Sequence, residues 1–214
     1  MKVFILSLIM SFTFTVCHAD FKDVVSDAYS YGSEVVFTDI ENVPWAHEAI
    51  EYFVKNGILK QNFEKKLYPN QPITREEFVD ILISAFGIYD TSATCTFTDI
   101  TKDYYGSIAT ANKCGIVNGI SEFEFGFGNN ILRRDICTMA YRTMEYLGNG
   151  FEVDYEITFE DTDAIPEYAL PSVTKLANMG IISGDNLNCF NPDNNTTRAE
   201  AYKIIYLLML KNAW

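Results

Sequence analysis

The feature that most constrains this chain is a set of landmarks that recurs three times in the same order. The first landmark is an aromatic-x-Asp opening, found at Phe37–Ile40, Phe97–Ile100 and Phe159–Thr162. Next comes a Gly-Ile segment, which begins at Gly57, Gly115 and Gly180. The third landmark reads ITREE at 73–77, ILRRD at 131–135 and TTRAE at 196–200. Ordered recurrence at a period of about sixty residues indicates tandem structural repeats.

Each repeat unit has the pattern of two helices joined by a loop. In the first unit, apolar residues recur at spacings of three and four, as in one face of a helix: Trp45, Ala49, Ile50, Phe53 and Val54. Pro44 suits an early helical position, and Gly57 is placed to end this helix in a left-handed conformation. Similar stripes mark the second helices of the three units: Phe78, Val79, Leu82, Ile83 and Phe86; Ile136, Met139, Ala140 and Met144; Ala201, Ile204, Ile205 and Leu208.

A two-helix unit cannot bury such a stripe by itself, so the three units must pack on one another. The predicted fold is therefore all-α, with three tandem helix-loop-helix units. The units are assigned to residues 37–90, 91–150 and 151–214. Residues 20–36 precede them as a segment with the potential to form a short helix.

Residues 1–19 have the pattern of a secretory signal peptide. A basic start at Lys2 leads into an apolar run from Val3 to Val16 that is too short to span a bilayer. Small residues before Asp20 suit cleavage by a signal peptidase, and Phe14–Val16 is a poor lead-in for lipoprotein processing at Cys17. We expect an exported chain that is not inserted in the membrane after cleavage.

Charge and residue usage disfavour several classes of function. The formal net charge of −13 disfavours nucleic acid and anionic lipid surfaces as main partners, because both require a broad basic face. His47 is the only histidine after the predicted signal peptide, and the cysteines lack CxxC spacing, so we expect no metal and no cofactor. No Ser-His-Asp order or Gly-rich phosphate loop is present, so we expect no enzyme. Free thiols and one or two disulfides both remain open for Cys95, Cys114, Cys137 and Cys189.

The segments ITREE and TTRAE each fit a helix capping box. Thr74 with Glu77, and Thr197 with Glu200, can exchange hydrogen bonds across a first helical turn. A cap does not explain arginine at the next position, where the helix dipole disfavours a cation. Arginine beside free helix N–H groups suits an anion receptor, because its guanidinium offers two parallel donors to a carboxylate or phosphate.

The chain resembles the S-layer homology (SLH) family over roughly residues 37–212. The resemblance rests on the aromatic-x-Asp openings, WAHEAI at 45–50, GIISG at 180–184 and the TRAE box at 197–200. It implies three tandem SLH repeats in a pseudo-threefold spindle with three central helices and three prongs. It also implies non-covalent attachment of a secreted protein to the cell wall or cell surface (the S-layer). The implied partner is the secondary polysaccharide of a Gram-positive-type wall, with a pyruvylated or otherwise acidic sugar bound in grooves between repeats.

Carried over residue by residue, the resemblance implies a set of ligand-binding positions. These are the arginines Arg75, Arg133 and Arg198, the aromatic residues Trp45 and Tyr168, and the glycines Gly119 and Gly184. The register favours Arg133 over Arg134, and in the second unit either Tyr104 or Tyr105 stands at the aromatic position.

We expect fewer than three full-strength sites, with the Arg198 box the best preserved. Leu132 and Asp135 weaken the cap of the second unit, and Gln61 replaces a glycine of the first. The openings' acids, Asp39, Asp99 and Asp161, are expected to cap the first helices rather than to touch ligand.

A protein-interaction or self-assembly module in a surface layer is the alternative function, with sugar binding lost. The two functions differ in what they require of the three motif arginines. Sugar binding requires guanidinium groups that face open grooves, whereas a scaffold tolerates guanidinium groups paired with acids and covered.

Overall fold

Helices account for all the regular elements in the part of the chain that the structure describes. The computed structural model describes residues 37–59, 64–149 and 158–212. The α-helices are α2 (His47–Lys55), α3 (Arg75–Ala85), α4 (Lys102–Lys113), α5 (Arg133–Tyr146), α6 (Leu170–Asn178) and α7 (Arg198–Asn212). Two short 3-10 helices are η1 (Pro44–Ala46) and η2 (Thr162–Ala164). The predicted all-α class is confirmed; the predicted signal peptide and residues 20–36 lie outside the described residues.

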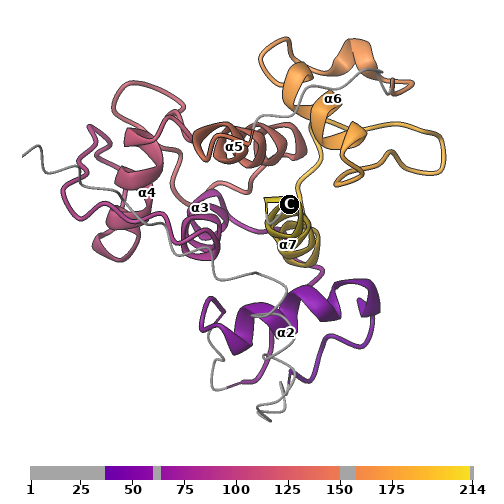
Figure 1. The fold of residues 1–214 in the computed structure, drawn as a ribbon, viewed down its shortest axis with the longest axis horizontal. Coiled ribbons are helices and arrows are strands. Elements are labelled where there is room, and N and C mark those ends of the chain that lie inside the picture. The colour runs from indigo at the N-terminus through magenta and orange to yellow at the C-terminus, as the bar shows by residue number, and fades with distance from the viewer. Residues whose placement is uncertain (1–36, 60–63, 150–157, 213–214) are drawn as a thin grey trace, which may run out of the picture. The chain divides into compact units, whose positions relative to one another are not determined.

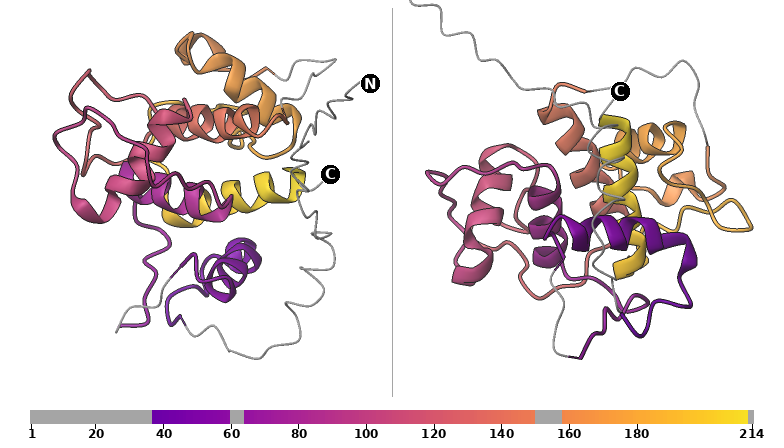
Figure 2. Two further views of the ribbon diagram at one scale, coloured as in Figure 1. Left: turned by 60° about the vertical axis from the view of Figure 1, so that its left-hand side comes forward. Right: turned by 60° about the horizontal axis from the view of Figure 1, so that its bottom comes forward.

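Three helices form the centre and three surround it. Helices α3, α5 and α7 lie together at the middle of Figure 1, and α2, α4 and α6 project outward from them. The two turned views in Figure 2 show the same separation of inner and outer helices. All the described residues belong to one compact unit, residues 33–214.

Each outer helix packs on the inner helix of a neighbouring repeat. Helix α4 packs on α3, α6 packs on α5, and α2 packs on α7, which also contacts α3 and α5. Thus α4 of the second unit covers α3 of the first, and α6 of the third unit covers α5 of the second. Helix α2 of the first unit covers α7 of the third. The order is cyclic, which is why three units close into one core.

The inner helices are buried on nearly all sides, as their central place requires. The predicted stripe residues Phe78, Leu82, Ile136, Ile205 and Leu208 are all fully buried. On the outer helix α2, burial is one-sided, and Gly57 follows it with a left-handed φ of 69°. This helix end and most of the apolar stripes are confirmed, but Trp45 is 48% exposed, and Val54 and Phe86 are only partly buried.

A closed ring of backbone hydrogen bonds joins the segments that enter the three inner helices. The N–H of Ile73 donates to Thr196 O (3.0 Å), that of Thr196 to Ile131 O (3.1 Å), and that of Ile131 to Ile73 O (3.0 Å). One residue of each unit takes part, at the same position before the motif arginine. The pseudo-threefold relation among the units therefore extends to single backbone atoms.

The inner helices begin as their sequences indicate. Thr74 Oγ1 accepts the N–H of Glu77, whose carboxylate accepts the N–H of Thr74, and helix α3 starts at the next residue. Thr197 and Glu200 exchange the same two bonds before α7. Helix α5 starts after Leu132, which provides no side-chain cap.

The acids of the three openings do not cap the outer helices, so that prediction is wrong. Asp99 accepts hydrogen bonds from three consecutive backbone N–H groups, those of Phe125 (2.8 Å), Gly126 (2.8 Å) and Phe127 (3.0 Å). Asp39 does the same for residues 67 and 68, and Asp161 for residues 190 and 191. Each acid braces the loop that leads into the inner helix of its own unit, because that loop turns several N–H groups inward.

Candidate functional site: the junctions between repeats

The motif arginine of the first unit crosses the junction to the second. Arg75 Nε donates to Phe125 O (3.0 Å), and Nη2 donates to Asn118 O (2.8 Å). The guanidinium carbon lies 5.1 Å from the centroid of the Phe125 ring. Burial lowers the pKa of Arg75, although the carboxylate of Asp135 opposes that change. Arg75 thus fastens α3 to the loop of the next repeat.

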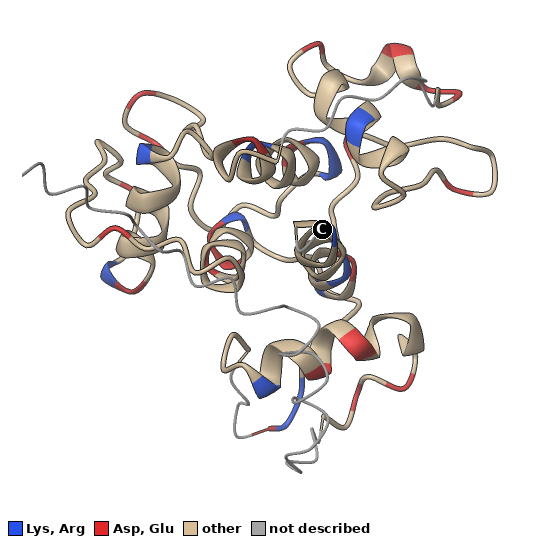
Figure 3. Cartoon of the chain, viewed as in Figure 1, with Lys and Arg blue, Asp and Glu red and all other residues tan. Residues whose placement is uncertain are grey.

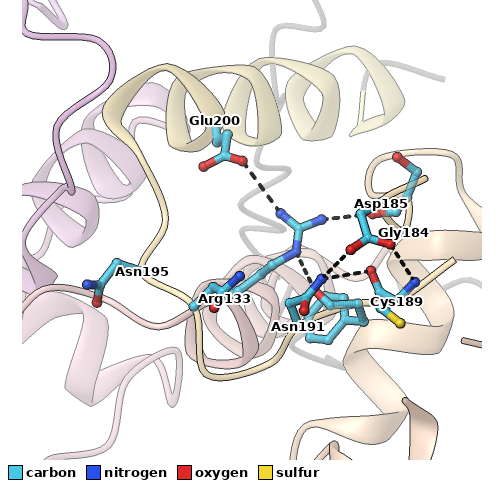
Figure 4. A pocket seen from close by; sticks show the side chains of 10 residues that line it. Arg133, Gly184, Asp185, Cys189, Asn191, Asn195 and Glu200 are labelled. Carbon is cyan, nitrogen blue, oxygen red and sulfur yellow. Dashed lines mark hydrogen bonds and ion pairs between the residues drawn. The ribbon is translucent and has the colours of Figure 1, made fainter. Parts of the chain in front are cut away.

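Arg133 repeats this geometry one junction further along the chain. Its Nε donates to Phe190 O (2.9 Å), its Nη2 donates to Ser183 O (2.8 Å), and its guanidinium carbon is 5.1 Å from the Phe190 ring. Figure 4 shows the guanidinium between Glu200 and the loop that carries Gly184 and Asp185. The neighbouring Arg134 instead donates from Nε to the hydroxyl of Tyr168 (3.0 Å).

These contacts change what the arginines can offer a ligand. The Nε–Nη2 edge is one of those by which a guanidinium can grip a carboxylate with two parallel bonds. In Arg75 and Arg133 that edge is occupied by backbone carbonyl groups. The expectation of two free parallel donors is therefore wrong for both residues, and the Nη1 group is what remains.

Each motif arginine also faces an acid from the first turn of the next inner helix. Arg75 Nη1 is 3.9 Å from Asp135 Oδ2, and Arg133 Nη1 is 4.0 Å from Glu200 Oε1. Arg198 completes the cycle, with its Nη2 at 2.5 Å from Glu77 Oε1. Only this third pair is in close contact.

Arg198 differs from the other two arginines in its remaining contacts. Its Nη1 lies 3.5 Å from the hydroxyl of Tyr202, and its buried Nε has no hydrogen-bond partner among the described residues. Burial disfavours the charge, but the hydrogen bonds with Tyr202 and Glu77 outweigh it and raise the pKa of Arg198. The loop that corresponds to the Asn118 and Ser183 loops includes residues 60–63, which lie outside the described residues.

Two cavities open at the junctions that Arg75 and Arg133 bridge. The cavity at Arg75, of about 470 Å³, is lined by Arg75, Asn118, Gly119, Ile120, Asp135, Thr138, Met139, Arg142 and Tyr168. The cavity at Arg133, of about 390 Å³, is lined by Arg133, Ser183, Gly184, Asp185, Cys189, Phe190, Asn191, Asn194, Asn195 and Glu200. Both volumes suit a small polar ligand or one residue of a polymer. Arg142 carries no motif and was not predicted.

Tyr168 brings a third repeat to the Arg75 cavity. Its side chain is about half exposed (52%), and its hydroxyl donates to Asp135 Oδ1 at 2.7 Å. One site thus combines an arginine, a loop and an aromatic ring from three different units. An exposed ring beside polar donors is the surface that a sugar ring can stack on.

The other aromatic candidates differ in their exposure and in their contacts. Trp45 is 48% exposed on η1, which contacts α7. Tyr104 packs edge-on against Phe127 at 5.8 Å, and burial, followed by the nearby Glu77, raises its pKa. Tyr104 is partly buried, whereas Tyr105 is 37% exposed.

Both predicted glycines line a cavity, but their own loops explain why they are glycine. A Cβ on Gly119 would lie 2.4 Å from the carbonyl oxygens of Ser121 and Glu124. A Cβ on Gly184 would lie 2.9 Å from the backbone of Asn188. At both positions the close contact is therefore with backbone atoms of the glycine's own loop.

The described residues contain no cluster of three or more His, Cys, Asp or Glu side chains that could hold a metal ion. Cys95, Cys114, Cys137 and Cys189 are free thiols. His47 is partly buried, and its Nε2 contacts Ile40 O at 2.8 Å. Among the helices of the described segments, none has the length and apolar character needed to cross a membrane.

Comparison with known proteins identifies part of the chain by family. Residues 36–79 and residues 158–201 match the model of the S-layer homology domain. These segments lie in the first and third predicted repeats; the second repeat, residues 91–150, has no match of its own to that model. The all-α architecture is consistent with an SLH fold.

Three relatives show where such sequences occur. The chain is 31% identical over 188 residues to an amylopullulanase of Thermoanaerobacterium thermosulfurigenes, covering 86% of this chain and 10% of the relative. It is 27% identical over 210 residues to an endoglucanase of Bacillus sp. (strain KSM-635), covering 98% of this chain and 22% of the relative. It is 23% identical over 173 residues to the surface-layer 125 kDa protein of Lysinibacillus sphaericus, covering 78% of this chain and 14% of the relative.

The chain therefore spans about a fifth or less of the length of these relatives. Their names describe proteins much longer than the segment that matches. What they share with this chain supports anchoring at the cell surface as its general role.

Proposed function

We propose that this protein attaches non-covalently to a bacterial cell wall by binding secondary wall polysaccharide at the junctions between its repeats. The observation that carries the proposal is the cavity at Arg75. It combines a guanidinium group, a half-exposed tyrosine and loop backbone, contributed by three repeats. Charged donors beside an aromatic face suit a sugar that bears an acidic group.

In this proposal the arginines have two roles: they hold the loop of the next repeat in place, and they contact the ligand. Arg75 and Arg133 each hold the loop of the next repeat, and that loop forms one wall of the cavity. The Nη1 group, which no carbonyl occupies, remains for the ligand. Folding and binding are therefore coupled at these junctions.

The Arg198 junction is the weakest candidate among the three. Its motif is the best preserved of the three in sequence, yet its guanidinium is held by Glu77 at 2.5 Å. A guanidinium in such a pair must give up a carboxylate before it can bind another. This one contact favours the alternative function, a surface-layer scaffold without sugar binding, at that junction.

The test is co-sedimentation of the full chain with Gram-positive wall sacculi, before and after chemical removal of the secondary polymer. We expect binding to intact sacculi and its loss after stripping. Tyr168→Ala should weaken binding severalfold, since the loss of one aromatic stacking contact costs on the order of 1 kcal/mol. Tyr89→Ala is the matched control, because Tyr89 is 63% exposed and lines neither cavity.

If the wild-type chain remains in the supernatant with every wall preparation, wall binding is wrong and a protein partner or self-assembly takes its place. If it sediments equally well with stripped walls, the secondary polymer is not the ligand. Thermal unfolding of both tyrosine variants checks that neither substitution has disturbed the fold.

A further inference from the structure

The two cavities have opposite charge balance. The Arg75 cavity is lined by two guanidinium groups, Arg75 and Arg142, and by one carboxylate, Asp135. The Arg133 cavity is lined by one guanidinium group and by two carboxylates, Asp185 and Glu200. Among the described residues, basic and acidic side chains are interspersed on the inner helices and the outer loops (Figure 3). The difference between the cavities is therefore local.

Arg142 is the residue that creates this difference. It lies on α5 on the same face as Asp135 and Thr138, at the spacing of three and four residues that brings helical side chains together. Arg142, Asp135 and Thr138 all line the Arg75 cavity. No hydrogen bond or ion pair joins Arg142 to any residue in the described segments. Its charge is available to a ligand.

The geometry of Arg75 explains why a second cation is needed for an anion. Its Nε and Nη2 donate to backbone carbonyl groups, and its Nη1 lies 3.9 Å from Asp135. A bound carboxylate can therefore receive donors from only one corner of Arg75, against the repulsion of Asp135. Arg142 supplies the missing donors and the compensating charge.

The equivalent positions at the other junctions do not provide this cation. Counted from the motif arginine, the place of Arg142 is taken by Leu207 in α7 and by Ser84 in α3. One turn earlier, Lys203 stands in α7, where its ammonium lies 6.0 Å from the Tyr206 ring, and it is not part of the Arg133 cavity wall. The corresponding residue in α3 is Asp80, which is acidic.

We propose that the two cavities bind different residues of the polymer, and that Arg142 is the specificity-determining residue. A sugar that bears a carboxylate binds in the Arg75 cavity, with its acid between Arg142 and Arg75 Nη1. The Arg133 cavity, with its two carboxylates, takes an uncharged or amino-bearing sugar. This inference rests on the proposed wall binding and assigns its anion selectivity to one junction.

The experiment measures binding of the full chain to secondary polysaccharide released from the wall. The polymer is used in its native form and after its carboxylates have been converted to neutral amides. We expect Arg142→Gln to weaken binding to the native polymer roughly tenfold or more, the effect of losing a charge-assisted contact. The same variant should bind the neutralised polymer as the wild type does.

Lys102→Gln is the matched control, because it removes the same charge from an exposed position on α4 outside both cavities. It should stay within about twofold of the wild type on either polymer, since an exposed charge at a distance is screened by salt. Circular dichroism melting checks that Arg142→Gln folds as the wild type does, which we expect because the side chain has no partner to lose.

Three outcomes overturn the inference while wall binding stands. They are unchanged binding of Arg142→Gln to the native polymer, an equal loss on both polymers, and wild-type binding that neutralisation leaves unaltered. A wild type that binds neither form of the polymer overturns the proposed function itself, and the assignment of the anion site with it.

Discussion

Arg198 and Glu77 meet at 2.5 Å although 121 residues separate them in the chain. The pair joins the first turn of α7 to the first turn of α3, which are the last and the first inner helices. Each side chain is about one quarter exposed. The contact closes the cycle of repeats with an ion pair, at the place where the other two junctions leave a gap of 3.9 to 4.0 Å.

This closure should be measurable as a coupling energy. In a double-mutant cycle with Arg198→Met and Glu77→Gln, we expect a coupling of about 1–2 kcal/mol in the free energy of unfolding, because the pair is largely withdrawn from water. The control is Lys113 with Asp90, which also meet at 2.5 Å but are 50% and 33% exposed. That pair should give a clearly smaller coupling than the closing pair, because solvent screens exposed charges. Equal coupling in the two cycles would show that burial does not strengthen the closing pair.

Thr196 is the polar member of the three residues that form the backbone ring. It is 1% exposed, and its Oγ1 has no hydrogen-bond partner in the described segments, while the equivalent residues are Ile73 and Ile131. We expect Thr196→Val to raise the free energy of unfolding by about 1 kcal/mol, because an unsatisfied buried hydroxyl is costly. Urea unfolding measures the change.

Thr143→Val serves as the comparison for Thr196→Val. Thr143 is also fully buried, but its Oγ1 donates to Met139 O at 2.9 Å. Loss of that bond should make this variant neutral or slightly less stable. A stability gain at Thr143 as large as that at Thr196 would mean that satisfaction of the hydroxyl is not the cause.

Two glycines should respond to alanine in opposite directions. Gly119→Ala should lower the free energy of unfolding by more than about 2 kcal/mol, because the new methyl group would press on backbone atoms that cannot rotate away. Gly106→Ala should raise it by up to about 1 kcal/mol, because Gly106 lies inside α4 with open space at its Cβ position. Thermal melts of both variants check the signs, and a tolerated Gly119→Ala would refute the close approach.

Asp99 should make stability depend on acidic pH. Burial raises its pKa, but the hydrogen bonds from the N–H groups of Phe125, Phe127 and Gly126 outweigh burial, so the folded pKa lies below 3.8. A lowered folded pKa adds stability above the ordinary pKa, and that stability is lost as the pH falls through the lowered value. We expect Asp99→Asn to cost about 1–3 kcal/mol at neutral pH and clearly less at about pH 3.

Asp163→Asn provides the control for that titration, because Asp163 is exposed and its carboxylate accepts no backbone hydrogen bond from the described residues. Urea unfolding of the three proteins at both pH values gives the comparison. A cost of Asp99→Asn that does not change with pH would contradict the role of the ionised carboxylate.

The proposed anion site shows how much of the candidate site could be predicted. Arg75 and Arg133 were identified from a motif, and the structure brings both to junctions that contain cavities. Arg142 could not be identified, because it belongs to no repeat landmark and its equivalents are Leu207 and Ser84. Its importance appears only when α5 is seen to form the wall of a cavity whose arginine comes from α3.

The sequence by itself determined the elements that depend on near neighbours. Apolar spacing placed the inner helices, and Thr74 with Glu77 placed the start of α3, because caps and stripes act within one or two turns. Tertiary structure alone decided what Asp99 binds, which carbonyls occupy Arg75, and why Arg198 is paired rather than free. Each of these contacts joins residues at least 26 positions apart. They are settled by the cyclic packing of outer helices on inner ones, and local sequence preferences carry no information about that order.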